Sequence, residues 1–177
     1  MIFSIRNATS EDAETLHAFI HGLAVYEREP DAVKVSPAEL RAQMQEPNPP
    51  FECLLATACE HGPVGFALFF HNYSTWKGKR GLHLEDLFVP PEHRGHGIGT
   101  ALLTALAKIA VERDCARMEW SVLDWNEPAI GFYEKLGAGG MDEWTTFRLT
   151  GEALRGLGAA PDGRRSDELR LRFQGGA

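Results

Sequence analysis

The feature that most constrains the fold is the segment PEHRGHGIGTALL, Pro91–Leu103, which places three glycines in five positions directly before an apolar helical pattern. Gly95, Gly97 and Gly99 leave the loop without side chains, so successive N–H groups can face an anion, and the helix N-terminus adds partial positive charge. Arg94 supplies a cation suited to phosphate oxygens. The segment therefore predicts a loop at the head of a helix that binds a pyrophosphate.

Two common phosphate-binding loops do not fit this segment. A Walker loop ends in Gly-Lys-Ser or Gly-Lys-Thr, whereas Gly99 is followed directly by Thr100. The dinucleotide fingerprint requires a small residue three positions after Gly97, and Thr100 takes that place. A glycine-rich turn without a ligand is the alternative interpretation.

The rest of the chain combines helical and strand patterns. Apolar spacing and capping residues predict helices at 9–29, 36–45, 98–113 and 126–137. Turn residues and β-prone runs predict strands at 2–8, 51–60, 63–73, 82–89, 116–124 and 143–151. This order predicts a mixed α/β fold with a single domain over 1–155. Residues 156–177 form a C-terminal extension, either peripheral or pairing with a sheet edge through 168–173.

Two adjacent carboxylates interrupt the apolar strand pattern at 82–89. Alternation along a strand would send Glu85 to one face of the sheet and Asp86 to the other. An unpaired carboxylate is costly to bury unless its pKa rises. We therefore expect Glu85 to act as a general base that takes a proton from an amine, directly or through a water. Asp86 would bind the amine or brace a loop, and an ordinary ion pair is the alternative for Glu85.

The motif Arg94-x-x-Gly97-x-Gly99, with LEDLFV before it and NEPAIGFYEKLGA after it, resembles the GNAT superfamily of N-acetyltransferases. Within that superfamily it is most similar to the diamine (spermidine/spermine) acetyltransferases and their thialysine-acetylating relatives. The resemblance extends from about Ile2 to Leu154. It implies a central mixed, mostly antiparallel twisted sheet, splayed between the two strands that flank the cofactor, with helices on both faces. It also implies acetyl-CoA as the donor, bound by its pyrophosphate, and a homodimer.

The resemblance assigns roles to individual residues. The positions implied to bind acetyl-CoA are Leu87, Phe88, Val89, Arg94, Gly95, His96, Gly97, Ile98, Gly99, Thr100, Asn126, Pro128, Ala129 and Tyr133. Tyr133 is implied to be the general acid that protonates the departing thiolate, and a core aromatic is its alternative role. The positions implied to bind the amine are Tyr26, Glu27, Trp76, Glu85 and Asp86, with Glu143 as a weaker candidate.

Together these features predict an acetyl-CoA-dependent N-acetyltransferase. Its acceptor would be a small cationic amine, namely a polyamine, a diamine or a lysine-like amino acid. Direct attack of the amine on the thioester is expected, because no Ser-His-Asp or Cys-His arrangement suggests an acyl-enzyme. Two alternatives are an acyl-CoA-binding sensor module without turnover and an acetyltransferase of a protein amine.

Composition narrows the expected partners. The formal net charge of −7 disfavours nucleic acid and is compatible with a cationic substrate. The three cysteines have no CxxC spacing and the histidines have no metal-ligand spacing, so no metal is expected. The N-terminus lacks a signal-peptide pattern, and no apolar run is long enough for a bilayer. We therefore expect a cytoplasmic protein that does not act on membranes.

Overall fold

The computed structural model describes residues 1–159. The chain divides into two compact units, Met1–Asp124 and a second that begins at Trp125, a boundary inside the domain predicted for 1–155. The strands are β1 (Phe3–Asn7), β2 (Glu52–Ala58), β3 (Gly62–Ser74), β4 (Lys79–Phe88) and β5 (Met118–Glu119). The α-helices are α1 (Ala13–Tyr26), α2 (Pro37–Met44), α3 (Ile98–Glu112), α4 (Glu127–Lys135) and α5 (Gly151–Gly158). Short 3₁₀ turns are η1 (Ser10–Asp12), η2 (Pro30–Ala32) and η3 (Pro91–His93).

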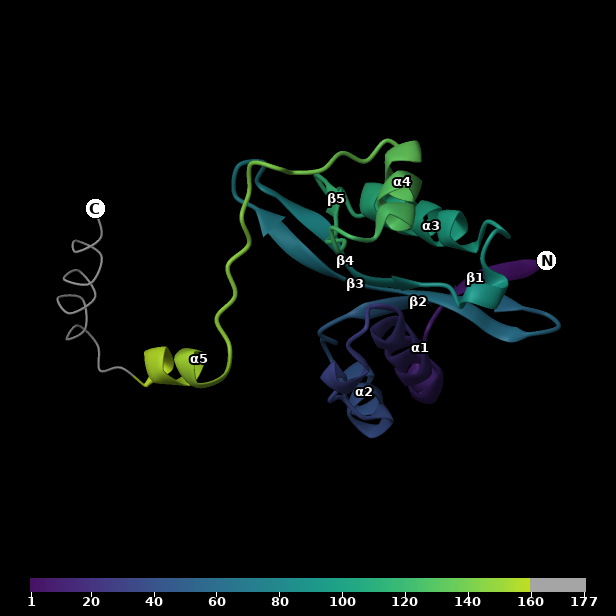
Figure 1. The fold of residues 1–177 in the computed structure, drawn as a ribbon, viewed down its shortest axis with the longest axis horizontal. Helices are drawn as coiled ribbons and strands as arrows, with labels where there is room; N and C mark the ends of the chain where they lie inside the picture. Colours follow the sequence, from purple (N-terminus) through teal and green to yellow (C-terminus); the bar gives the residue numbers. More distant parts are fainter. Residues whose placement is uncertain (160–177) are drawn as a thin grey trace. The chain divides into compact units, whose positions relative to one another are not determined.

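The first unit is built on a sheet with the order β1-β2-β3-β4-β5 (Figure 1). Its first three pairings are antiparallel, and β4 pairs with β5 in parallel. Two parallel strands need a crossover connection between them, and α3 provides it by returning the chain to the end of the sheet at which β4 begins. The mixed, mostly antiparallel sheet that the resemblance implied is confirmed.

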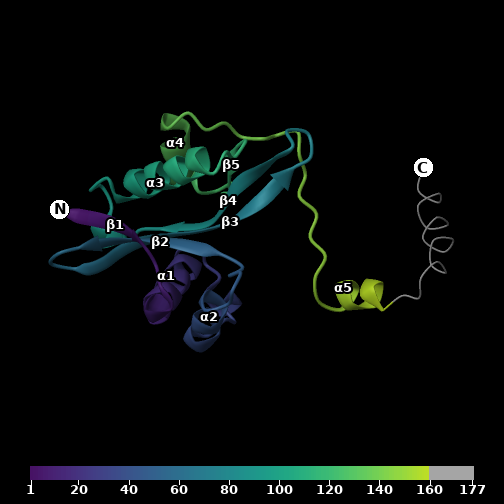
Figure 2. The same cartoon turned by 180° about the vertical axis from the view of Figure 1, so that it is seen from behind.

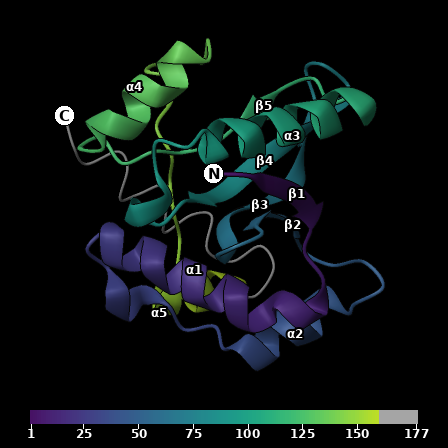
Figure 3. The ribbon, with the colours of Figure 1, turned by 90° about the vertical axis from the view of Figure 1, so that its right-hand side faces the viewer.

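Helices cover both faces of this sheet. α1 and α2 lie on one face and α3 on the other, as Figures 2 and 3 show from two sides. Under α1 the core is a cluster of buried side chains in which Phe19 stacks on Phe66 of β3 at 5.6 Å between ring centroids. On the other face α3 buries one apolar stripe, namely Ile98, Leu102, Leu103, Leu106 and Ala110. Because both faces are covered, the central strands have apolar residues at successive positions.

The end of α1 is fixed by its own backbone. The N–H of Glu29 donates to the carbonyl of Ala24 at 2.9 Å, and Arg28 takes a left-handed conformation with φ of 68°. A left-handed residue just past the last turn is the usual way to stop a helix, although glycine normally fills it. This cap holds Tyr26 and Glu27 at a defined place at the end of α1.

Two of the predicted strands differ from the structure. The strand predicted for 116–124 is present only as Met118–Glu119, because β4 supplies partners to two residues there. The strand predicted for 143–151 does not form: residues 144–150 lack regular structure and α5 begins at Gly151. Alternation produces a strand only where a neighbouring strand offers backbone partners. The described residues of the second unit include no strand.

Two further expectations concern the C-terminal extension and the absence of a membrane span. The edge strand predicted at 168–173 lies outside the described residues. Among residues 1–159, no helix has both the length and the apolar character that a bilayer span needs.

Candidate functional site

The glycine loop joins the end of β4 to α3 and has the backbone shape that the sequence suggested. Gly95 and Gly97 have φ angles of 78° and 79°, in the left-handed region that glycine adopts without strain. A Cβ at either position would meet no atom within 4 Å. The backbone conformation, rather than contact with other protein atoms, is therefore what requires glycine here.

The loop contains a run of N–H groups without backbone hydrogen-bond partners. No backbone carbonyl of residues 1–159 accepts a hydrogen bond from the N–H groups of Gly95 through Thr100. Gly97 is the N-cap of α3 and has no side chain to cap it, while Ile98 is buried and anchors the first turn. Consecutive unpaired N–H groups at a helix N-terminus form an anion-binding concavity. The imidazole Nδ1 of His96 lies 3.0 Å from the carbonyl oxygen of Arg94, within the same loop.

Arg94 is held beside this loop by two contacts. Its Nε donates a hydrogen bond to the carbonyl of Val89 at 2.9 Å. Its guanidinium carbon lies 4.6 Å from the centroid of the Tyr26 ring, a cation–π distance. The contact joins the glycine loop to the end of α1.

The carboxylates of β4 lie at an irregularity of the strand. Leu68 and Phe69 are adjacent in β3, yet their partners in β4 are Asp86 and Leu84. Glu85 is therefore an extra residue, a β-bulge, which locally interrupts alternation.

The bulge places both carboxylates on the α1 face. Asp86 is opposite Leu68, which belongs to the core cluster under α1, and opposed residues share a face. Glu85 Oε2 lies 3.7 Å from Nε2 of His83, whose ring lies 4.9 Å from that of Phe70, two residues along β3 from Leu68. The expectation that Glu85 and Asp86 point to opposite faces is wrong, because the bulge shifts the phase of the strand.

Glu85, Asp86 and Glu27 form what we call the acidic cluster. Burial raises the pKa of Asp86 to about 6, and the negative charges of Glu85 and Glu27 contribute to the rise. Burial also raises the pKa of Glu27. The carboxyl group of Asp86 has no hydrogen bond or ion pair with any other of the described residues. A partly buried carboxyl with this environment favours a cation placed against it. The side chain of Glu85 is 55% exposed and accessible to such a cation.

Trp76 lies away from the acidic cluster. It occupies the turn between β3 and β4 and is 85% exposed. Along β4 the distance from Lys79 to Glu85 is roughly 20 Å, from a rise of about 3.3 Å per residue. Of the proposed amine-binding positions in the first unit, the structure therefore brings together Glu27, Glu85 and Asp86, and puts Tyr26 against Arg94.

The edge of β4 that faces away from β3 lacks a paired strand over the residues that lead to the glycine loop. Pairing with β5 covers Leu82 and His83, and no strand among the described residues pairs with the edge from Leu84 to Phe88. The resemblance implied that two strands splay apart beside the cofactor, and in the structure β4 and β5 pair over only two residues each. Phe88 packs so closely on α1 that a Cβ at Gly22 would lie 2.9 Å from its ring. The backbone groups of Leu87, Phe88 and Val89 are thus placed by a tightly packed segment.

The remaining site candidates lie in the second unit. Asn126 caps α4, its side chain accepting a hydrogen bond from the N–H of Ala129 at 3.4 Å, and Pro128 stands in the first turn. The predicted cap is confirmed. Tyr133 lies two turns further along the helix, with its ring centroid 5.3 Å from that of Phe132. Glu143 precedes the irregular segment 144–150.

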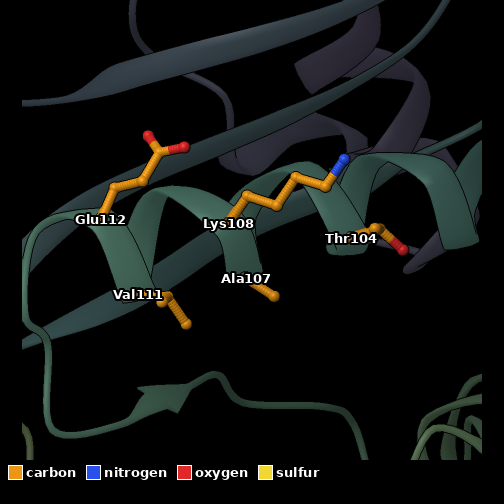
Figure 4. A pocket seen from close by; sticks show the side chains of 5 residues that line it. All are labelled: Thr104, Ala107, Lys108, Val111 and Glu112. Atoms are coloured by element: carbon orange, nitrogen blue, oxygen red, sulfur yellow. The ribbon is translucent and has the colours of Figure 1, made fainter.

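A shallow hollow on the outer surface of α3 is a separate feature (Figure 4). Its lining residues all belong to that helix, namely Thr104, Ala107, Lys108, Val111 and Glu112. It has one cation and one carboxylate and none of the unpaired N–H groups. We therefore place the candidate site at the glycine loop and the acidic cluster. No three His, Cys, Asp or Glu side chains gather as metal ligands in residues 1–159.

Neither the bulge nor the contact between Arg94 and Tyr26 was predicted. The two residues are far apart in the sequence, so no local pattern relates them. The sequence does not reveal the bulge. Leu84 and Phe88 are an even number of positions apart, so simple alternation would place them on the same face, yet they are buried on opposite faces.

Comparisons with known proteins agree with this arrangement. Residues 15–138 match the Acetyltransferase (GNAT) family. The chain is 40% identical over 163 residues to a thialysine N-epsilon-acetyltransferase of Bos taurus, covering 86% of this chain and 95% of that protein. It is 32% identical over 201 residues to an L-ornithine N5-acetyltransferase of Arabidopsis thaliana, covering 89% and 88%. A solved integron cassette protein from the V. cholerae mobile metagenome superposes with a TM-score of 0.76 at 25% identity, covering 90% and 99%.

Proposed function

This chain belongs to the GNAT family of acetyltransferases and is an N-acetyltransferase, and on that premise we propose that it acetylates the terminal amine of a lysine-like amino acid or a diamine. The observation that carries the proposal is Asp86, a partly buried carboxyl without a cationic partner among the described residues, within the acidic cluster. A small dication would supply the missing positive charge.

The donor site we propose is the glycine loop. The N–H groups from Gly95 to Thr100 and the guanidinium of Arg94 would hold the pyrophosphate of acetyl-CoA, which fits a concavity of unpaired donors with a neighbouring cation. The backbone at Leu87 and Phe88, on the edge of β4 that pairs with no described strand, would hold the pantetheine arm together with Val89. Acetyl-CoA supplies the acetyl group as a thioester.

The acidic cluster prepares the amine for attack. A primary amine is mostly protonated at neutral pH and must lose a proton before its nitrogen can form a bond. Glu85, at the exposed side of the cluster, is the proposed acceptor of that proton, directly or through a water. Asp86 and Glu27 would hold the cationic molecule in place. The new N–C bond forms at the carbonyl carbon, the C–S bond breaks, and coenzyme A leaves with the bonding electrons.

The departing thiolate needs a proton. We assign this step to the hydroxyl of Tyr133 on α4, and assign Asn126, Pro128 and Ala129 to donor binding, because these residues match the family motif. Proton balance then closes: Glu85 gains one proton from the ammonium group and later releases it to solvent, Tyr133 gives one to the sulfur, and the second proton that the nitrogen loses as the amide forms restores the Tyr133 hydroxyl.

The kind of acceptor is suggested by the relatives. One acts on thialysine and another on ornithine, by their names, and both compounds carry an amine at the end of a short chain. Lys79, at the base of the turn that carries Trp76, lies about 20 Å along β4 from Glu85, so we do not expect a short acceptor to use both Trp76 and Glu85.

The test is thiol release from acetyl-CoA with a panel of amines. Thialysine, lysine, ornithine, putrescine and spermidine are compared with butylamine, which matches putrescine but lacks the second amine. We expect kcat/KM for putrescine or an amino-acid acceptor to exceed that for butylamine at least tenfold. Equal rates for putrescine and butylamine, or turnover confined to a lysine-containing peptide, would contradict the proposed acceptor.

Two organisational proposals accompany this function. We propose that the acetyltransferase domain spans residues 1–155 and that the protein is a homodimer, as the resemblance implies. Sedimentation equilibrium of the full chain measures the second directly, and a monomer at micromolar concentration would refute it.

A further inference from the structure

We infer that Tyr26 serves the donor rather than the amine: its ring is a support that holds Arg94 ready for the pyrophosphate. This inference rests on the proposed function, and it departs from the amine-binding role that the family resemblance gives to Tyr26. Tyr26 would then be a positioning residue that acts through Arg94.

The geometry around Arg94 carries the inference. The hydrogen bond from Nε to the Val89 carbonyl, at 2.9 Å, fixes one edge of the guanidinium. The guanidinium carbon lies over the Tyr26 ring, 4.6 Å from its centroid. The hydrogen bond and the ring contact together restrict where the guanidinium can lie. No acceptor among the described residues takes a hydrogen bond from its two terminal nitrogens, which are the ones that form paired bonds to phosphate oxygens.

The ring is itself held firmly. Tyr26 is the last residue of α1, whose preceding turns are buried against β3 and β4 through Phe19. The left-handed residue Arg28 then stops the helix. A support that is already ordered lowers the entropy lost when a long side chain such as Arg94 becomes fixed on binding.

The end of α1 therefore has two adjacent residues with different tasks. Glu27 adds its negative charge to the environment of Asp86, on the amine side. Tyr26 contacts Arg94, on the donor side. Removing the ring should therefore weaken the use of acetyl-CoA without changing the use of the amine.

The experiment compares two donors. Acetyl-CoA contains the pyrophosphate, whereas acetyl-pantetheine has the same thioester arm but no pyrophosphate. Both are assayed by thiol release at saturating amine. For Tyr26→Leu we expect kcat/KM for acetyl-CoA to fall about two- to fivefold, the size of an exposed cation–π contact. We expect kcat/KM for acetyl-pantetheine and the KM of the amine to stay as in the wild type.

Matched variants separate the ring from general damage. Tyr26→Phe keeps the aromatic face and should behave as the wild type with both donors. Tyr73→Leu removes an exposed tyrosine of β3 and should leave both donors unaffected. In an Arg94→Met background, Tyr26→Leu should cause no further loss with acetyl-CoA, because the two residues act as one unit.

The outcomes distinguish this inference from the function on which it rests. If Tyr26→Leu impairs both donors equally, or raises the KM of the amine, the ring serves the acceptor and the inference is wrong. The same conclusion follows if its effect adds in full to that of Arg94→Met. A wild-type protein that binds no coenzyme A in calorimetry would overturn the proposed function and the inference together.

Discussion

Glu85 and Asp86 are consecutive residues of β4, and their carboxyl groups nevertheless lie on the same face of the sheet because Glu85 is the extra residue of a β-bulge. The two groups differ in environment. Asp86 is partly buried and its pKa is raised to about 6, while the side chain of Glu85 is more than half exposed. This difference suits Asp86 to holding a cation and Glu85 to exchanging a proton.

Replacing Asp86 with asparagine should weaken amine binding. The change removes a partly buried negative charge, so we expect the KM of the amine to rise about tenfold at pH 7.5, equivalent to about 1.4 kcal/mol. In the wild type, kcat/KM for the amine should fall below pH 6, as Asp86 takes up a proton and loses its charge. The pH profile of Asp86→Asn should lack this acid limb. An unchanged limb would assign it to another group.

The same variant has a stability signature with a defined sign. The pKa of Asp86 in the folded protein, about 6, exceeds its ordinary 3.8, so the folded state binds more protons between these values. Stability therefore falls as pH rises through that window, by about 3 kcal/mol at most. Asp86→Asn should be more stable than the wild type at pH 7.5 and lose this advantage near pH 4. Urea melts at both pH values measure the difference.

Replacing Glu85 with glutamine should reduce kcat. Without the proton acceptor the reaction depends on amine that is already unprotonated, so the loss should be greatest at low pH. We expect about a hundredfold loss at pH 7 and a smaller loss at pH 9, with the coenzyme A affinity unchanged in calorimetry. A loss of the same size at every pH would argue that Glu85 only binds the amine.

Replacing Tyr133 with phenylalanine removes the proposed acid and keeps the ring. General acid catalysis is typically worth about 10²–10⁴ in rate. We expect kcat to fall by at least a hundredfold while the Kd of acetyl-CoA changes less than twofold. Phe132→Leu, at the neighbouring position, is the matched control and should retain kcat. Unaltered turnover in Tyr133→Phe would remove Tyr133 from the acid role.

Replacing Gly97 with alanine should weaken donor binding. A residue with a Cβ adopts φ near +79° at a cost of about 1–2 kcal/mol, and the loop can relieve that strain by turning its N–H groups away. We expect the Kd of coenzyme A to rise about tenfold. Gly78→Ala imposes similar strain at φ of 62° in the turn between β3 and β4, and should lower stability while leaving coenzyme A binding intact.

Replacing Arg28 with glycine should stabilise the first unit. Arg28 holds a left-handed conformation at the end of α1 that glycine adopts without strain. We expect the free energy of unfolding to rise by about 1 kcal/mol, measured by urea denaturation. A decrease would mean that contacts of the Arg28 side chain outweigh its backbone strain.

Much of the fold could be predicted because its signals are local. The helix over 98–113 and the glycine loop before it are specified by apolar spacing and by glycines at positive φ, and both are present. The helix capped by Asn126 is likewise specified by neighbouring residues. The segment 143–151 has strand-like alternation but is not a strand, because pairing depends on a partner that alternation does not reveal.

The candidate site was predicted as a set of residues and not as a geometry. Glu27, Glu85 and Asp86 could be named in advance, but their grouping depends on a bulge and on where α1 stops. Both are long-range results of packing between β3, β4 and α1. The contact between Arg94 and Tyr26 arises in the same way, through two elements that meet only in the folded chain.

The two-residue ladder between β4 and β5 has a consequence for solubility. From Leu84 to Phe88, β4 presents peptide groups along an edge for which the described chain supplies no strand. Such an edge is a template for aggregation with other extended chains. In the donor site that we propose, the pantetheine arm, which carries two amides, would lie along this edge as a substitute strand, so a bound donor would also shield the protein from intermolecular strand addition.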